Sequence, residues 1–157
     1  MYKNIVLHWT AGNYKPCYDD LNHYHYLIDG DGNVISGIYE PRDNLNCKTG
    51  KYAAHTGGGN TGRIGIAVCC RKDEKTQPTR KQIEAMCQLA AKLCGIYGLQ
   101  PKDCITHAEF GKNHPTTSSY GKIDINFLAY ANVSGIDETA KYLRNKIQWY
   151  YNKVRGL

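Results

Sequence analysis

Short apolar segments of strand length recur along the first two thirds of the chain. They are rich in branched and aromatic residues and end at residues typical of turns, which is the pattern of β-strands. Residues 29–33 (Asp-Gly-Asp-Gly-Asn) tolerate positive φ and predict a hairpin turn. Residues 64–70 are continuously apolar, as expected of a central strand buried on both faces. The predicted strands are residues 4–8, 24–28, 34–37, 64–70 and 104–106.

Apolar residues spaced three and four apart predict two long helices in the second half of the chain. The first is expected to begin at Thr79, which forms a capping-box pattern with Gln82, and to end at Gly98. The second is expected from Asp137 to about Val154. The apolar faces are Ile83, Met86, Ala90, Leu93, Cys94 and Tyr97 in the first helix, and Ala140, Leu143, Ile147, Tyr150 and Tyr151 in the second.

Strands that alternate with helices, together with one hairpin, predict an α/β fold with a mixed central β-sheet flanked by α-helices. The 157 residues have the length of one ordinary domain, and no repeat or linker divides them, so we expect residues 1–157 to form a single domain. No segment approaches the roughly 18 apolar residues of a membrane span, so no membrane insertion is expected. Because the first strand begins close to Met1, we expect synthesis in the cytoplasm without a signal peptide.

Composition narrows the choice of partner and compartment. The formal net charge of +6 favours an anionic partner: nucleic acid, an acidic membrane or the bacterial cell wall. A nucleic-acid-binding protein would carry a contiguous basic stripe, whereas the basic residues here are scattered, so nucleic acid is not expected. The seven cysteines contain no C-x-x-C pair, and we expect them to be buried reduced thiols, as in a reducing compartment.

Three residues stand where a metal site is expected. His8 ends the first strand, His107 follows the strand at 104–106, and Asp124 lies in a later loop. Functional residues gather where strands end, and two imidazoles with one carboxylate are a typical set for a catalytic zinc that keeps one position open for water. Two alternatives stay open: Asp124 also fits the N-cap of a helix starting at Ile125, and His114 would then be the best substitute ligand.

Five motifs in order resemble one enzyme family. They are His-Trp-Thr-Ala-Gly from His8, Tyr-His-Tyr-Leu-Ile-Asp-Gly-Asp-Gly from Tyr24, His-Thr-Gly-Gly-Gly from His55 followed by Ile-Gly-Ile from Ile64, Thr-His-Ala-Glu from Thr106, and Lys-Ile-Asp from Lys122. Together, over about residues 3–130, the chain resembles the zinc-dependent N-acetylmuramoyl-L-alanine amidases. Amidase-type phage lysozymes and peptidoglycan recognition proteins share the fold of that family.

The resemblance implies a role for each matching residue. His8, His107 and Asp124 would bind Zn²⁺, Tyr24 would be the active-site tyrosine, and Lys122 would stabilise the oxyanion of the attacked amide. A second group would line the substrate site: His55 corresponds to a histidine of a substrate-lining loop. The adjacent Gly57 and Gly58 would let ligand approach the backbone closely, although a simple flexible turn is the alternative.

Two departures from the family pattern affect these expectations. The 17-residue spacing from His107 to Asp124 is longer than that of family members with a cysteine ligand, which leaves the third ligand open. Ala67 stands where some members carry a glutamate general base, so the proton acceptor is not identified; Glu109 is the nearest carboxylate to consider.

The resemblance implies a hydrolase that cleaves the amide bond between N-acetylmuramic acid and L-alanine in bacterial peptidoglycan. We expect an endolysin-like enzyme of phage or prophage type that acts on the cell wall after release from the cytoplasm. The alternative is a noncatalytic muropeptide-binding module on the same fold. Such modules usually lack a zinc ligand, whereas all three candidate ligands are present here.

Overall fold

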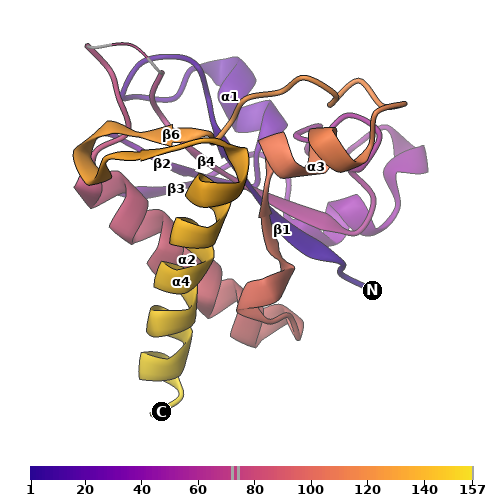
Figure 1. The fold of residues 1–157 in the computed structure, drawn as a ribbon. Helices are drawn as coiled ribbons and strands as arrows, with labels where there is room; N and C mark the ends of the chain where they lie inside the picture. The colour runs from indigo at the N-terminus through magenta and orange to yellow at the C-terminus, as the bar shows by residue number, and fades with distance from the viewer. Residues whose placement is uncertain (72, 74, 157) are drawn as a thin grey trace.

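A computed structural model describes residues 1–71, 73 and 75–156 and shows a central sheet of five strands (Figure 1). The strand order is β3-β2-β4-β1-β5, with β1, β2, β4 and β5 parallel and β3 antiparallel to β2. The predicted mixed α/β sheet is therefore confirmed, and each predicted strand is present within two residues at either end. The strands are β1 (Asn4–Trp9), β2 (Tyr26–Ile28), β3 (Val34–Ser36), β4 (Arg63–Val68) and β5 (Cys104–Thr106).

Both predicted long helices are present and cover one face of the sheet. They are α2 (Arg80–Tyr97) and α4 (Ile136–Val154), which pack alongside each other in Figure 1. The Thr79–Gln82 capping box forms, and Gly98 ends α2 in the left-handed conformation that glycine adopts without strain. No helix within the described residues is long and apolar enough to cross a bilayer.

Alternate side chains of the central strands β1 and β4 point to the apolar core and to the opposite face of the sheet. Ile5, Leu7 and Trp9 of β1 belong to the apolar cluster beneath α2 and α4, as do Ile64, Ile66 and Val68 of β4. Successive side chains of a strand point to opposite faces. His8 of β1 and its register partner Ala67 of β4 therefore lie on the face away from the helix pair.

Several short elements were not predicted from the sequence. They are α1 (Tyr18–His23), α3 (His107–Asn113), a hairpin of β6 (Phe127–Leu128) and β7 (Val133–Ser134), and the 3₁₀ turns Pro41–Leu45, Cys47–Thr49, Pro101–Asp103 and Ala129–Ala131. The helix considered from Ile125 does not form, because residues 125–126 lead directly into β6.

The cysteines largely follow the expectation of buried thiols. Five of the seven, Cys69, Cys70, Cys87, Cys94 and Cys104, are buried, and all seven are free. Cys17 is exposed and Cys47 is half-buried, so two of the seven depart from the predicted burial.

Candidate metal centre and cleft

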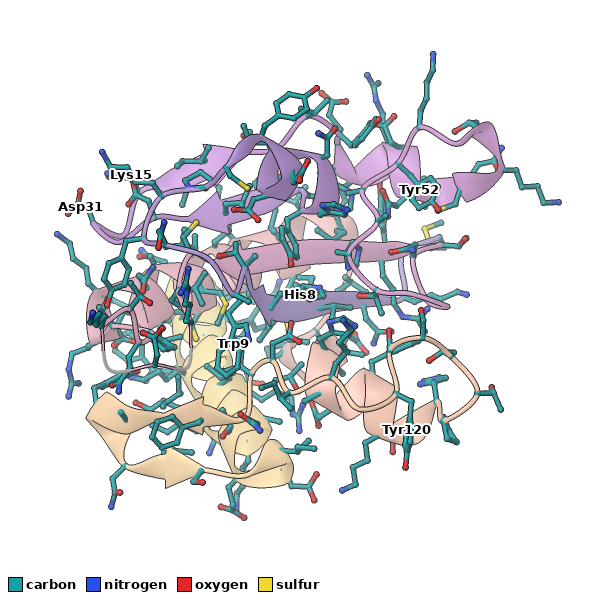
Figure 2. All side chains as sticks on the ribbon, turned by 90° about the horizontal axis from the view of Figure 1, so that it is seen from above. His8, Trp9, Lys15, Asp31, Tyr52 and Tyr120 are labelled. Carbon is teal, nitrogen blue, oxygen red and sulfur yellow. The ribbon has the colours of Figure 1, made fainter. Side chains whose placement is uncertain are left out.

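The three predicted zinc ligands come together from three distant segments. His8 lies near the end of β1, and β5 pairs directly with β1, so the chain delivers His107 beside His8 as the first residue of α3. Asp124 follows the loop after α3 and reaches the same point, where its backbone carbonyl accepts a hydrogen bond from the Ala108 amide. Figure 2 shows His8 on strand β1 near the middle of the view, with the loop that carries Tyr120 to one side.

The donor atoms form a small, nearly equilateral triangle. His8 Nδ1 lies 3.1 Å from His107 Nδ1 and 3.1 Å from Asp124 Oδ2, and His107 Nδ1 lies 3.2 Å from Asp124 Oδ2. All three residues are at most 7% exposed. Among the described residues, this is the one group of three or more His, Cys, Asp or Glu side chains whose ligand atoms all lie within 4.8 Å of one another.

This triangle fits one face of a tetrahedral zinc site. With metal–ligand distances of about 2.0–2.2 Å, tetrahedral donor atoms lie about 3.3–3.6 Å apart, slightly more than the 3.1–3.2 Å found here. Two imidazole nitrogens and a carboxylate oxygen are donors that zinc prefers. The residues present therefore fit zinc, with the side of the triangle toward the cleft left for water or substrate.

The charge states of the ligands at neutral pH also suit a divalent cation. Burial lowers the pKa of His8 to about 4 even though the hydrogen bond to Asp124 opposes this. Burial opposes ionisation of Asp124, but His107 and His8, each of which donates to this carboxyl when its ring is protonated, hold the pKa of Asp124 well below its usual range. His8 is therefore neutral and Asp124 is charged at pH 7, which are the forms that bind a metal ion.

A cleft of about 700 Å³ opens over the ligand triangle. Its walls come from α1, the segment that carries His55, and the loop between α3 and β6. The lining residues are Trp9, Thr10, Ala11, Asp20, His23, Tyr24, Ala54, His55, Gly57, His107, Ser118, Gly121, Lys122, Ile123 and Asp124. Seven of the eight site residues predicted from the sequence lie in this cleft or at the metal centre; Gly58 does not.

The two predicted catalytic side chains lie on different walls of the cleft. Tyr24 follows α1, just before β2, and its ring centroid is 5.1 Å from that of His8. Burial raises the pKa of Tyr24 well above its ordinary value, helped by the negative charge of Asp124. Tyr24 is thus a neutral phenol at pH 7. Lys122 is exposed at the rim, two residues before Asp124.

The segment that carries His55 lines the cleft and also reaches the metal centre. His55 is only 5% exposed, and its Nδ1 lies 3.1 Å from His8 Nε2, so it contacts a candidate ligand directly. Burial is the main cause that lowers the pKa of His55 well below its usual range. Gly65 of β4 makes room for this ring, because a Cβ there would lie 2.5 Å from His55 Cγ.

Gly57 and Gly58 pack closely against the loop between α3 and β6. A Cβ on Gly57 would lie 2.0 Å from Ser118 Oγ, and one on Gly58 would lie 2.5 Å from Thr117 Cγ2. Gly58 lines a smaller hollow beside Lys3 and Arg63, away from the metal centre. The structure therefore does not bring Gly58 into the cleft with the other candidate residues, and this glycine makes room for packing of the loop against Thr117.

The competing candidates for the site have other partners. His114 stacks on Phe110 with ring centroids 3.9 Å apart and bonds the Phe110 carbonyl through Nδ1, so it does not replace Asp124. Glu109 caps α3 and forms two hydrogen bonds with the Arg144 guanidinium, which removes it as a proton acceptor in the cleft. Ala67 lies beside His8 in the sheet and has no group to accept a proton.

Sequence reasoning missed two buried polar residues near the centre. Ser119 is fully buried and lies 2.9 Å from His107 Nε2 through its Oγ. In the run Thr-Thr-Ser-Ser-Tyr nothing distinguishes Ser119 from its neighbours. His25 bonds Asn44 and the Gly65 amide beneath the site. Alternation along the strand places His25 on the same face of the sheet as Leu27, two residues on. Leu27 pairs with Ala67, so this is the face away from the helix pair.

Comparison with known proteins supports the fold through structures of low sequence identity. Hydrolase AmiA of Staphylococcus aureus, solved with its ligand, matches 99% of this chain and 75% of its own at 19% identity, with a TM-score of 0.69. The amidase LysC of Clostridium intestinale matches 69% of this chain and 71% of its own at 21% identity, with a TM-score of 0.53. No curated protein matches.

A third structure comes from an amidase with a bound substrate. The N-acetylmuramyl-L-alanine amidase AmiD of E. coli, in complex with anhydro-N-acetylmuramic acid-L-Ala-D-γ-Glu-L-Lys, matches 68% of this chain and 48% of its own at 21% identity, with a TM-score of 0.51. The family model of N-acetylmuramoyl-L-alanine amidases matches residues 2–120, which include His8 and His107 and stop just before Asp124. This chain, with its five-stranded sheet and convergent His-His-Asp group, belongs to the N-acetylmuramoyl-L-alanine amidase family.

Proposed function

We propose that the chain is a single catalytic domain, a zinc-dependent amidase that cleaves the bond between N-acetylmuramic acid and L-alanine in peptidoglycan. The observation that carries the proposal is the triangle of His8 Nδ1, His107 Nδ1 and Asp124 Oδ2 at the base of a cleft. A module that only binds muropeptides has no need of three converging metal ligands. Family membership and the substrate complex of AmiD support peptidoglycan as the partner.

The residues around the triangle suit hydrolysis of an amide. When bound, zinc lowers the pKa of a coordinated water to about 7 and polarises a carbonyl. Lys122, exposed at the rim, offers an ammonium to the oxyanion that develops on the attacked carbonyl. Tyr24 remains protonated at neutral pH, so its phenol orients water or the substrate carbonyl by hydrogen bonding rather than acting as a base.

We also propose an endolysin-like role, with synthesis in the cytoplasm and action on the wall after release. Two features support it. The seven free thiols, five of them buried, suit a reducing compartment. The net charge of +6 favours adsorption to an anionic cell wall.

The proposal is tested by digestion of purified cell walls followed by mass spectrometry. We expect fragments that carry a free L-alanine amino terminus, uncut glycan chains, loss of this release after metal chelation, and recovery with added zinc. An Asp124→Ala variant is the matched control and should release less than a hundredth of the wild-type product. Release that survives complete chelation, or cleavage only within the glycan or the stem peptide, would contradict the proposal.

A further inference from the structure

Each ligand histidine has a second ring nitrogen that faces protein rather than the metal centre. His8 Nε2 lies 3.1 Å from His55 Nδ1, and His107 Nε2 lies 2.9 Å from Ser119 Oγ. Both contacts are buried. Which of the two ring nitrogens carries hydrogen is decided by what these partners can donate or accept.

The contact of His107 continues to a backbone carbonyl. Ser119 Oγ is 2.7 Å from the Gly57 carbonyl oxygen, which can only accept, so the serine hydroxyl donates to it. Ser119 Oγ then accepts the hydrogen bond from His107, and His107 must carry its hydrogen on Nε2. This leaves the lone pair of His107 Nδ1 directed at the metal centre.

The contact of His8 also leads to a backbone carbonyl, through the ring of His55. His55 Nε2 lies 3.1 Å from the Arg63 carbonyl oxygen and donates to it, so Nδ1 of the neutral His55 ring is an acceptor. His8 Nε2 is therefore the donor, because two lone pairs facing each other at 3.1 Å would repel. Thr56 Oγ1, 2.7 Å from His55 Nδ1 and 3.5 Å from His8 Nε2, adds a hydroxyl at this junction.

We infer that Ser119 and His55 are positioning residues that lock both ligand imidazoles in the Nε2–H tautomer and thereby present two Nδ1 lone pairs to zinc. The inference rests on the proposed zinc site. It also gives a role to the long stretch between His107 and Asp124. That stretch packs against Gly111, where a Cβ would lie 2.0 Å from the Ser119 carbonyl oxygen, and so returns Ser119 to His107.

The structure also shows why the three donor atoms need a cation. With both Nε2 atoms protonated, two nitrogen lone pairs and a carboxylate oxygen face one another within 3.1–3.2 Å. Such a cluster of acceptors is repulsive until a cation binds between them. Hydrogen bonds that orient metal-binding histidines typically change metal affinity by about 10–100-fold when they are removed.

The test measures zinc affinity by competition with a chromogenic chelator, without reference to enzymatic turnover. We expect Ser119→Ala to raise the zinc dissociation constant about 10–100-fold, and His55→Phe, which keeps a ring but no acceptor, to act in the same direction. Ser134→Ala, at an exposed hydroxyl of β7 outside the cleft, is the matched control and should bind zinc as the wild type does. Circular dichroism melts check that each variant is folded.

A second measurement needs no variant. Nitrogen-15 NMR of the zinc-loaded wild type distinguishes the two imidazole tautomers, and we expect Nε2–H for both His8 and His107. An Nδ1–H form in either ring, or equal zinc affinity of Ser119→Ala and wild type, would overturn the inference alone. Wild-type protein that binds no zinc would overturn both the metal site and the inference. Zinc binding weakened as expected, without release of L-alanine amino termini from walls, would overturn only the amidase function.

Discussion

Lys122 is the cationic side chain closest in sequence to a candidate ligand, and it stands at the rim of the cleft. Asp124, two residues on, is buried, whereas Lys122 is exposed. An ammonium at the exposed rim can move toward an oxyanion that develops over the metal centre. Its contribution should therefore appear in the chemical step more than in substrate binding.

We predict that Lys122→Met lowers kcat about 100–1,000-fold, the usual loss for one donor to an oxyanion, and leaves KM nearly unchanged. Steady-state release of L-alanine amino termini from a soluble muropeptide measures both constants. Lys141→Met, at an exposed position on α4 outside the cleft, is the control and should retain wild-type rates. An unchanged kcat for Lys122→Met would remove this lysine from the mechanism.

From the sequence, the three candidate metal ligands were easier to identify than the residues that hold them in place. His8 and His107 were identified because strand ends are recognisable and neighbouring parallel strands bring their ends together. Ser119 and the positioning role of His55 depend on which loops meet in space, and neither residue stands out in its local sequence. A run of glycines indicates that another group approaches the backbone closely, but it does not say which group. For Gly58 the sequence suggested substrate, and in the structure the neighbour is Thr117.

At the scale of elements, His25 joins three segments beneath the site. Its Nδ1 accepts a hydrogen bond from the Gly65 amide of β4, and its Nε2 donates to Asn44 Oδ1 in the turn at Pro41–Leu45. Asn44 in turn bonds Ala53, close to His55. The network requires a neutral imidazole, since a protonated Nδ1 could not accept from the amide.

This requirement makes the stability of the fold depend on pH. Burial lowers the pKa of His25 to about 4 from an ordinary 6.5, with Asn44 partly opposing the shift. The unfolded chain therefore binds more protons than the native protein between these values, and the stabilisation present above pH 6.5 is lost as the pH falls toward 4. At pH 5 the loss from this group is about 2 kcal/mol relative to pH 7.

We predict that urea denaturation of chelated protein shows a lower free energy of unfolding at pH 5 than at pH 7. His25→Gln, which does not titrate in this range, should remove about 2 kcal/mol of that difference. His8 titrates in both proteins and cancels in the comparison. If the variant shows the same difference between pH 5 and pH 7 as wild type, His25 is not responsible for the pH dependence.

The long elements were predictable from the sequence and the short ones were not. α2 carries a capping box, an apolar stripe and a terminal glycine, and all three signals agree. α1 and α3 span six and seven residues, too few for a periodic pattern to emerge. The capping box of α3, Thr106 with Glu109, was present in the sequence, but its Thr-His-Ala-Glu segment matched a family motif and was assigned to chemistry instead.

In the molecule as a whole, one face of the sheet forms the hydrophobic core and the opposite face carries the cleft. The helix pair α2 and α4 covers an apolar face, and the candidate metal ligands lie with the cleft on the other side. Arg144 of α4 links the two regions through a two-pronged ion pair with Glu109, in the first turn of the helix that begins with His107. Packing of α4 thereby helps to fix where His107 starts.

Whether a single zinc ion binds between His8, His107 and Asp124 can be measured by X-ray diffraction at the zinc absorption edge. Crystals of the protein loaded with one equivalent of zinc should show one anomalous peak, about 2.0–2.2 Å from Nδ1 of both histidines and an oxygen of Asp124. A peak at another set of residues, or no peak at this triangle in zinc-loaded crystals, would show that these three residues do not form the zinc site.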